Sequence, residues 1–186
     1  MKRMLSIAMI LLTFCGCSRS NNEINRALAL RERILGANGC TFETTITSDY
    51  GDKIYTFSMD CRADASGAVT FTVTAPETIS GICGTLSEGG GKMTFDDQAL
   101  LFEMLADDQV SPVSAPWLFV HTLCGGYIKA CGKIGQGILI QIDDSYSQKA
   151  LQLNIQTDEN DIPVSAEIFW QGMRIVSMDV ENFNFV

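Results

Sequence analysis

The sequence is poor in the residues from which metal and catalytic centres are built. It contains one histidine, His121, and none of its seven cysteines belongs to a Cys-x-x-Cys pair. Protein zinc sites draw on cysteine and histidine at such close spacings, so we predict no metal ion and no cofactor. The sequence also lacks a nucleophile motif and a plausible pair of catalytic carboxylates, which predicts a protein that is not an enzyme. His121 follows Trp117 by one helical turn and is expected to pack on its indole.

Basic residues are scarce as well. Lys and Arg number 13 against 22 Asp and Glu, which gives a formal net charge of −9. Proteins that bind nucleic acid place a positive surface against the phosphates, so the composition excludes nucleic acid as a partner. The acidic surface also disfavours docking on anionic lipid head groups without an anchor.

Apolar runs long enough to cross a membrane are missing. A membrane-spanning helix needs about 20 predominantly apolar residues, and the apolar run Leu5–Phe14 is shorter than that. This run follows Lys2 and Arg3, and the order of charged start and short apolar stretch is typical of an N-terminal targeting segment. The segment is therefore expected to direct export and to form no part of the fold.

The end of this segment, Leu12–Cys17, reads Leu-Thr-Phe-Cys-Gly-Cys. It resembles the lipobox of bacterial lipoproteins, in which signal cleavage leaves an N-terminal cysteine that carries diacylglycerol. The resemblance implies a signal peptide at residues 1–16, a lipid such as palmitate on Cys17, a tether at 17–22 and a single domain at 23–186. It also implies an anchor in the cell membrane, on the extracytoplasmic face. An ordinary secretory peptide, cut nearby, is the alternative.

Alternating apolar and polar residues predict an antiparallel hairpin between Cys40 and Cys61. A two-residue turn at Tyr50-Gly51 would place Ile46 opposite Tyr55, and Cys40 opposite Cys61. Because cysteines outside the cytoplasm can pair, we expect a disulfide bond between Cys40 and Cys61. Two free thiols, buried as small hydrophobic groups, are the alternative. Three further cysteines have no predicted partner: Cys83, Cys124 and Cys131.

The alternation continues to Leu86 and gathers large apolar side chains on one face of a curved sheet. Such a face can bind a lipid or acyl chain if a pocket of roughly 300–1,000 Å³ stays open once the helices are in place. If the helices fill the concavity, the same side chains form an ordinary core. The candidate cavity-lining residues, including one from a mid-chain helix, are Phe42, Ile46, Tyr55, Phe57, Met59, Phe71, Val73 and Trp117.

Two helices are expected among the strands. Apolar residues recur at helical spacing from Asn21 or Asn22 to about Leu35. Arg31 lies on this apolar stripe, where its stem would cover hydrophobic surface while its head reaches water or meets a polar group of a ligand. A second, short and very apolar helix is expected within the segment Pro112–Cys124.

The predicted fold class is mainly β with α. We expect a curved antiparallel half-barrel sheet of about 9–11 sequentially paired strands, since so many strands must curl to hide their apolar face. An N-terminal amphipathic helix and a short mid-chain lid helix complete it. The order of helix, Cys40–Ser87 strands, Pro112–Cys124 insertion and closing strands Val164–Phe185 resembles the LolA-like superfamily of bacterial lipoproteins and lipoprotein carriers, over residues 21–186.

Two short runs, Pro76–Gly84 and Ser111–Pro116, are similar to those of GerS-type germination lipoproteins. The superfamily resemblance implies a half-barrel that carries a lipid, acyl chain or other apolar ligand. The GerS-type resemblance implies instead a non-enzymatic scaffold or activator that binds a protein partner of the cell envelope. Both functions are therefore expected as alternatives, and an open sheet edge would favour the second.

Overall fold

The computed structural model describes residues 20–51, 53–96, 98–103, 105–106, 109–147 and 149–186. The predicted signal peptide and the predicted lipidation site, Cys17, lie outside these residues. Among the described helices, none is long and apolar enough to cross a membrane.

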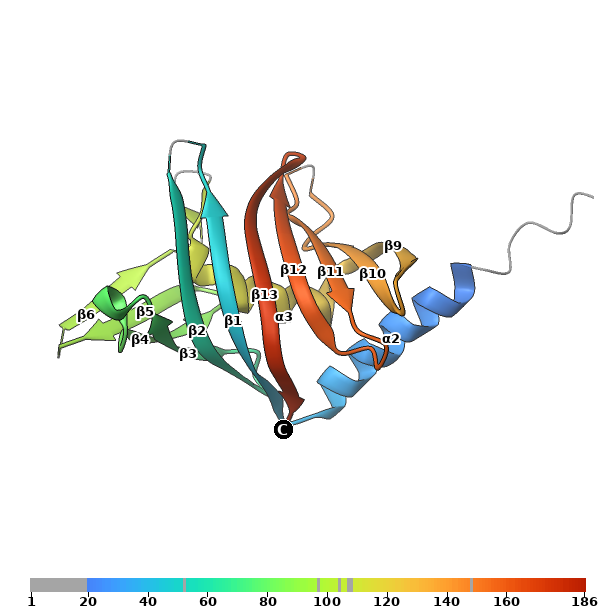
Figure 1. The fold of residues 1–186 in the computed structure, drawn as a ribbon, viewed down its shortest axis with the longest axis horizontal. Coiled ribbons are helices and arrows are strands. Elements are labelled where there is room, and N and C mark those ends of the chain that lie inside the picture. Colours follow the sequence, from blue (N-terminus) through green and yellow to red (C-terminus); the bar gives the residue numbers. More distant parts are fainter. Residues whose placement is uncertain (1–19, 52, 97, 104, 107–108, 148) are drawn as a thin grey trace, which may run out of the picture.

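Eleven antiparallel strands form one continuous sheet, in the order β6-β5-β4-β3-β2-β1-β13-β12-β11-β10-β9. Figure 1 shows this sheet curling round the helix α3. The strands are β1 (Gly39–Asp49), β2 (Ile54–Asp64), β3 (Val69–Ala75), β4 (Cys83–Ser87), β5 (Gly90–Phe95), β6 (Gln98–Phe102), β9 (Tyr127–Ile134), β10 (Gly137–Asp143), β11 (Gln152–Thr157), β12 (Pro163–Trp170) and β13 (Met173–Phe185). Two short strands, β7 (Leu105–Ala106) and β8 (Gln109–Val110), pair with each other. The predicted fold class is confirmed.

Both predicted helices are present. The helix α2 (Ser20–Gly36) packs on β9 and β10. The helix α3 (Ala115–Gly125) follows the 3₁₀ turn η3 (Pro112–Ser114), and a further 3₁₀ turn, η2 (Glu77–Ile79), follows β3. Pro116 lies in the first turn of α3, where a helix does not need the backbone N–H that proline lacks. Eight of the eleven residues of α3 are buried, including Trp117, Leu118 and Phe119, which is the pattern of a helix inside a core.

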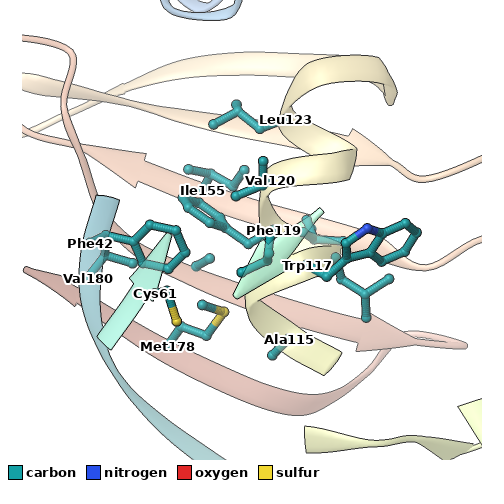
Figure 2. Close-up of a cluster of buried hydrophobic side chains, with 14 of the residues drawn as sticks. Phe42, Cys61, Ala115, Trp117, Phe119, Val120, Leu123, Ile155, Met178 and Val180 are labelled. Carbon is teal, nitrogen blue, oxygen red and sulfur yellow. The ribbon is translucent and has the colours of Figure 1, made fainter. Parts of the chain in front are cut away.

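The helix α3 fills the concave side of the sheet. Phe119 is fully buried, and its ring centroid lies 5.5 Å from that of Phe42 on β1 and 6.4 Å from that of Phe183 on β13. Figure 2 shows Phe119, with Val120 and Leu123 further along the helix, among side chains that come from the strands. Packing of α3 against both halves of the sheet therefore forms the core.

The first hairpin has a different register from the predicted one. Ile46 pairs with Phe57 instead of Tyr55, because residues 50–53 separate the two strands and the turn is not confined to Tyr50-Gly51. The shift amounts to two residues along the partner strand. Because side chains alternate between faces with a period of two, each side chain keeps its predicted face. Only the identity of the partners was predicted wrongly.

The two halves of the sheet meet at β1 and β13. These strands pair through residues such as Thr44 and Val180, with an irregularity in register between Thr41 and Glu43. We predicted that all strands pair with their sequence neighbours, and this prediction is wrong here. The β1–β13 pairing joins two meanders, β1–β6 and β9–β13, into one sheet whose edges are β6 and β9.

The strands β4–β6, which we call the wing, continue the sheet away from β3 (Figure 1), and most of their side chains are exposed. Aromatic rings lie over two of the wing's glycines. A Cβ atom at Gly84 would lie 2.5 Å from the ring of Phe71, and one at Gly91 would overlap the ring of Phe102. The two glycines thus make room for rings that fill the inner face of the wing, an arrangement that also pins strand register.

Candidate ligand-binding pocket

The structure brings seven of the eight candidate cavity-lining residues into one core. Phe42, Ile46, Phe57, Met59, Phe71, Val73 and Trp117 have exposed fractions of 8% or less. Tyr55 differs, because it lies at the start of β2 with 47% of its surface exposed and contacts the ring of Tyr50. The helix α3 occupies the space that a ligand lying over Phe42 would need.

An apolar pocket of about 370 Å³ opens where the C-terminal ends of α2 and α3 meet the start of β1, the end of β2 and the turn after β2. We call it the helix-end pocket. Its volume falls within the range of roughly 300–1,000 Å³ that is usual for small-molecule sites. The apolar residues that line it include Ile34, Leu35, Cys40, Ala63, Val120 and Cys124.

Arg31 fixes the wall that α3 contributes. Its Nε donates a hydrogen bond of 2.7 Å to the carbonyl of Leu123, and its Nη2 donates one of 2.8 Å to the carbonyl of Gly126. The last carbonyls of a helix have no partner within the helix, and a cation there also interacts favourably with the helix dipole. Burial lowers the pKa of Arg31 from its ordinary value. The guanidinium, expected to reach water or a ligand, instead ties the end of α3 to α2.

The turn between β2 and β3 forms another wall of the pocket. The Asp64 carboxylate accepts hydrogen bonds from the Ser66 hydroxyl (2.6 Å) and from the backbone N–H groups of Ser66 (2.8 Å) and Ala68 (3.2 Å). The hydroxyl bond is the main reason why the pKa of Asp64 is lowered. An ionised carboxylate thus holds the turn and adds a polar group at the rim of an otherwise apolar site.

The thiols of the pocket are uncharged at neutral pH. Burial is the main reason why the pKa of Cys40 is raised to about 12, and the neighbouring Cys124 contributes a smaller part of that rise. Burial also raises the pKa of Cys124, although the positive charge of Arg31 acts in the opposite direction. Both cysteines therefore contribute apolar surface.

The predicted opposition of Cys40 and Cys61 is wrong. Cys40 lies opposite Ala63, and Cys61 lies opposite Phe42. Diagonal neighbours on adjacent strands are about 7–8 Å apart, whereas a disulfide needs Cβ atoms at about 3.5–4.5 Å. Both cysteines are free thiols in the structure.

His121 lies at the rim of the pocket and is exposed, while Trp117 beneath it is buried. Their rings stack with centroids 4.4 Å apart and planes inclined by 15°. This confirms the expected packing of the histidine on the indole. Within the part of the chain that the structure describes, no group of three or more His, Cys, Asp or Glu side chains is placed to hold a metal ion.

A second hollow, of about 430 Å³, lies across β13, β1, β2 and β3 and is open to solvent. Most of its lining is polar and projects from the face of the sheet opposite to α3, as with Glu43, Asp60, Arg62 and Asn182. An apolar ligand would gain little burial there. The helix-end pocket is therefore the better candidate for such a ligand.

Sequence reasoning missed most residues of the helix-end pocket. The apolar stripe of α2 was recognised, but Ile34 and Leu35 on it were not assigned to a site. Cys124 was known only as the end of an apolar helix. The sequence did predict that each of the two helices ends at a glycine. It could not predict that these two ends lie close together, because their proximity depends on how the sheet curls.

Comparison with known proteins gives matches to solved structures only. No family model matches the sequence, and no curated protein matches it. A conserved protein from Thermus thermophilus matches with 11% identity and a TM-score of 0.48, over 88% of this chain and 87% of that one. A LolA superfamily protein from Nitrosomonas europaea matches with 7% identity and a TM-score of 0.47, over 86% and 93%.

The lipoprotein LppX from Mycobacterium tuberculosis matches with 14% identity and a TM-score of 0.40, over 88% of this chain and 93% of that one. A protein named as a member of the LolA superfamily, the family that the order of elements in the sequence resembles, is thus among the structures that match. The likeness to GerS-type lipoproteins stays a prediction. Because all three TM-scores are below 0.5, the fold assignment rests on the strand order and register described above.

Proposed function

We propose that this protein is a lipoprotein of the extracytoplasmic face of the cell membrane, and that it binds a lipid, an acyl chain or another apolar ligand in the helix-end pocket. The observation that carries the proposal is the pocket itself. Its apolar walls come from α2, α3 and the first hairpin, and its volume is about 370 Å³. Walls that are mainly apolar, with a few polar groups placed to orient the ligand, are the usual composition of a small-molecule site.

The polar groups of the pocket are arranged at its rim. Asp64 is the last residue of β2, Ser66 lies in the turn that follows, and His121 lies on the exposed side of α3. The thiols of Cys40 and Cys124 are neutral, so the interior offers no charge to an alkyl chain. This arrangement suits a ligand whose apolar end enters the pocket while its polar end stays near solvent.

The test is native mass spectrometry of the protein purified from membranes in a gentle detergent, followed by titration of the delipidated protein with a fluorescent fatty acid. Mass beyond the N-terminal lipid, released by organic solvent, together with saturable binding of the probe, is the expected result. A protein with neither additional mass nor probe binding would overturn the proposal.

A pair of variants localises the binding. Cys124→Phe fills the helix-end pocket, whereas Cys131→Phe enlarges another half-buried cysteine, on β9, away from the pocket. Weaker probe binding is expected in the first variant only, with thermal unfolding as the check that both fold. Equal binding in the two variants would place the ligand elsewhere.

The anchor has its own test. Cells that express the protein are fed labelled palmitate, and label is expected in the wild type and in Cys15→Ser, but not in Cys17→Ser. Label that persists in Cys17→Ser would remove the lipid anchor from the proposal and leave the pocket to be judged separately.

A further inference from the structure

The two edges of the eleven-stranded sheet, β6 and β9, are protected to different degrees. An edge strand leaves the backbone N–H and C=O groups of alternate residues without strand partners, and proteins block such edges with charged residues, irregular backbone or a covering element. The edge strand β9 has these protections. It carries the charged residues Lys129 and Lys133, and it contains Gly132, which has no side chain. The helix α2 also packs on it.

The edge strand β6 has none of these protections among its five residues. Its sequence is Gln-Ala-Leu-Leu-Phe, without charge, proline or glycine. Leu100 is 59% exposed and Leu101 is 76% exposed. Because successive side chains of a strand point to opposite faces, the strand presents exposed apolar surface on both faces. Both its backbone and its side chains are therefore suited to contact another strand.

The wing presents this edge in a fixed shape. On its inner face the rings of Phe71 and Phe102 lie over Gly84 and Gly91. These contacts link β3 to β4 and β5 to β6, so the register of the edge strand is set before any partner arrives. An edge ordered in advance costs less entropy on binding than a segment that must first be ordered.

The charges at the two ends of β6 indicate which strand would fit. Asp96 precedes the strand and Glu103 follows it, and both are exposed. An antiparallel second copy of the chain would bring each Glu103 to the Asp96 end of the other copy, and opposed like charges destabilise strand pairs. Lys92, on β5, lies one strand further from the edge. A segment with basic residues at its ends would instead pair with both acidic groups.

We propose that β6 is a docking edge for a protein partner, which adds an extended segment to the sheet as a further strand. The segment is apolar in its middle and carries Lys or Arg at its ends. Backbone hydrogen bonds along β6 supply the pairing, Leu100 and Leu101 supply apolar contacts on the two faces, and Asp96 and Glu103 select the basic ends.

The test uses the synthetic peptide Lys-Val-Thr-Val-Thr-Val-Lys, labelled with a fluorophore, and the full protein. Three results are expected. The peptide binds by fluorescence anisotropy, its binding weakens as salt rises, and amide hydrogen exchange slows at alternate residues of β6. A peptide with Glu at both ends should bind at least tenfold more weakly, and one with Pro at its central position should not bind.

Two variants complete the experiment. Leu101→Lys places a charge on the exposed edge and should weaken binding at least tenfold, while Met173→Lys changes a similarly exposed apolar residue on β13 and should leave binding unchanged. Equal binding to both variants, or no binding to the wild type, would overturn the proposal. A dimer of the wild type that Leu101→Lys dissociates would overturn it as well, because the edge would then belong to a second copy.

Discussion

Replacement of Arg31 by Met tests whether the contact between the two helices holds the helix-end pocket together. The methionine keeps much of the apolar stem but removes both donors, so the carbonyls of Leu123 and Gly126 lose hydrogen bonds of 2.7 and 2.8 Å. A hydrogen bond to a charged group contributes about 1.5–3 kcal/mol. Because the arginine is only half-buried, we expect a loss of about 2–3 kcal/mol in the free energy of unfolding.

The measurement is urea unfolding followed by tryptophan fluorescence, with thermal unfolding as a second observable. In a domain of this size each kcal/mol corresponds to about 2–4 °C, so the melting temperature should fall by roughly 4–12 °C. Binding of the fluorescent fatty acid should weaken in parallel, since α3 supplies one wall of the pocket.

The matched control is Arg33→Met on the same helix. Arg33 is exposed, makes one long hydrogen bond of 3.3 Å to the carbonyl of Asn160, and has its guanidinium carbon 4.4 Å from the ring centroid of Phe185. Exposed contacts of this kind contribute up to about 1 kcal/mol. If the two variants lose the same stability, the reasoning that Arg31 caps α3 is refuted.

Two further predictions concern the glycines of the sheet and the buried thiols. Gly84→Ala should lower the free energy of unfolding by about 1–3 kcal/mol, because the new Cβ would meet the carbonyl oxygen of Lys92 and the ring of Phe71 at 2.5 Å. Gly132→Ala, which has open space around its Cβ, should cost nothing in the same urea titration, and equal losses would contradict the packing described for the wing. Burial raises the pKa of Cys61 above its ordinary value, so the folded protein holds this proton at pH values where the unfolded chain has released it, and stability must fall as pH rises past about 9. Urea titrations at several pH values between about 9 and 10.5 give the free energy of unfolding as a function of pH. We expect it to fall less steeply in Cys61→Ala than in the wild type, by about 1.4 kcal/mol per pH unit. An equal pH dependence in the two proteins would show that folding does not protect this thiol from ionisation.

The sequence predicted the faces of the strands better than their partners. The alternation through Phe42, Ile46 and Phe57 depends only on the period of a strand, so it survived an error of two residues in the first hairpin. The error arose because the pattern does not define how many residues a turn contains. The error also removed the proposed opposition of Cys40 and Cys61, since opposition depends on register.

The candidate site was harder to predict because it depends on long-range geometry. The sequence indicated that large apolar residues share a face, but α3 determines that this face is a core around Phe119. The helix-end pocket combines residues from four elements, and the contact of Arg31 with Leu123 spans 92 positions in the chain. Spacing along a sequence contains no information about a contact of that kind.

The pairing of β1 with β13, which forms the seam between the two halves of the sheet, has a consequence for the order of folding. Thr44 and Asp179, which meet there, are 135 positions apart. Closing a loop of that length costs about 3 kcal/mol more entropy than closing a hairpin of four residues, so the two meanders should assemble from local contacts before the seam forms. Because β13 follows every other strand of the sheet in the chain, the sheet cannot be completed until all of these strands have been synthesised. Until then β1 is itself an unpaired edge, and the chain depends on rapid completion to escape aggregation.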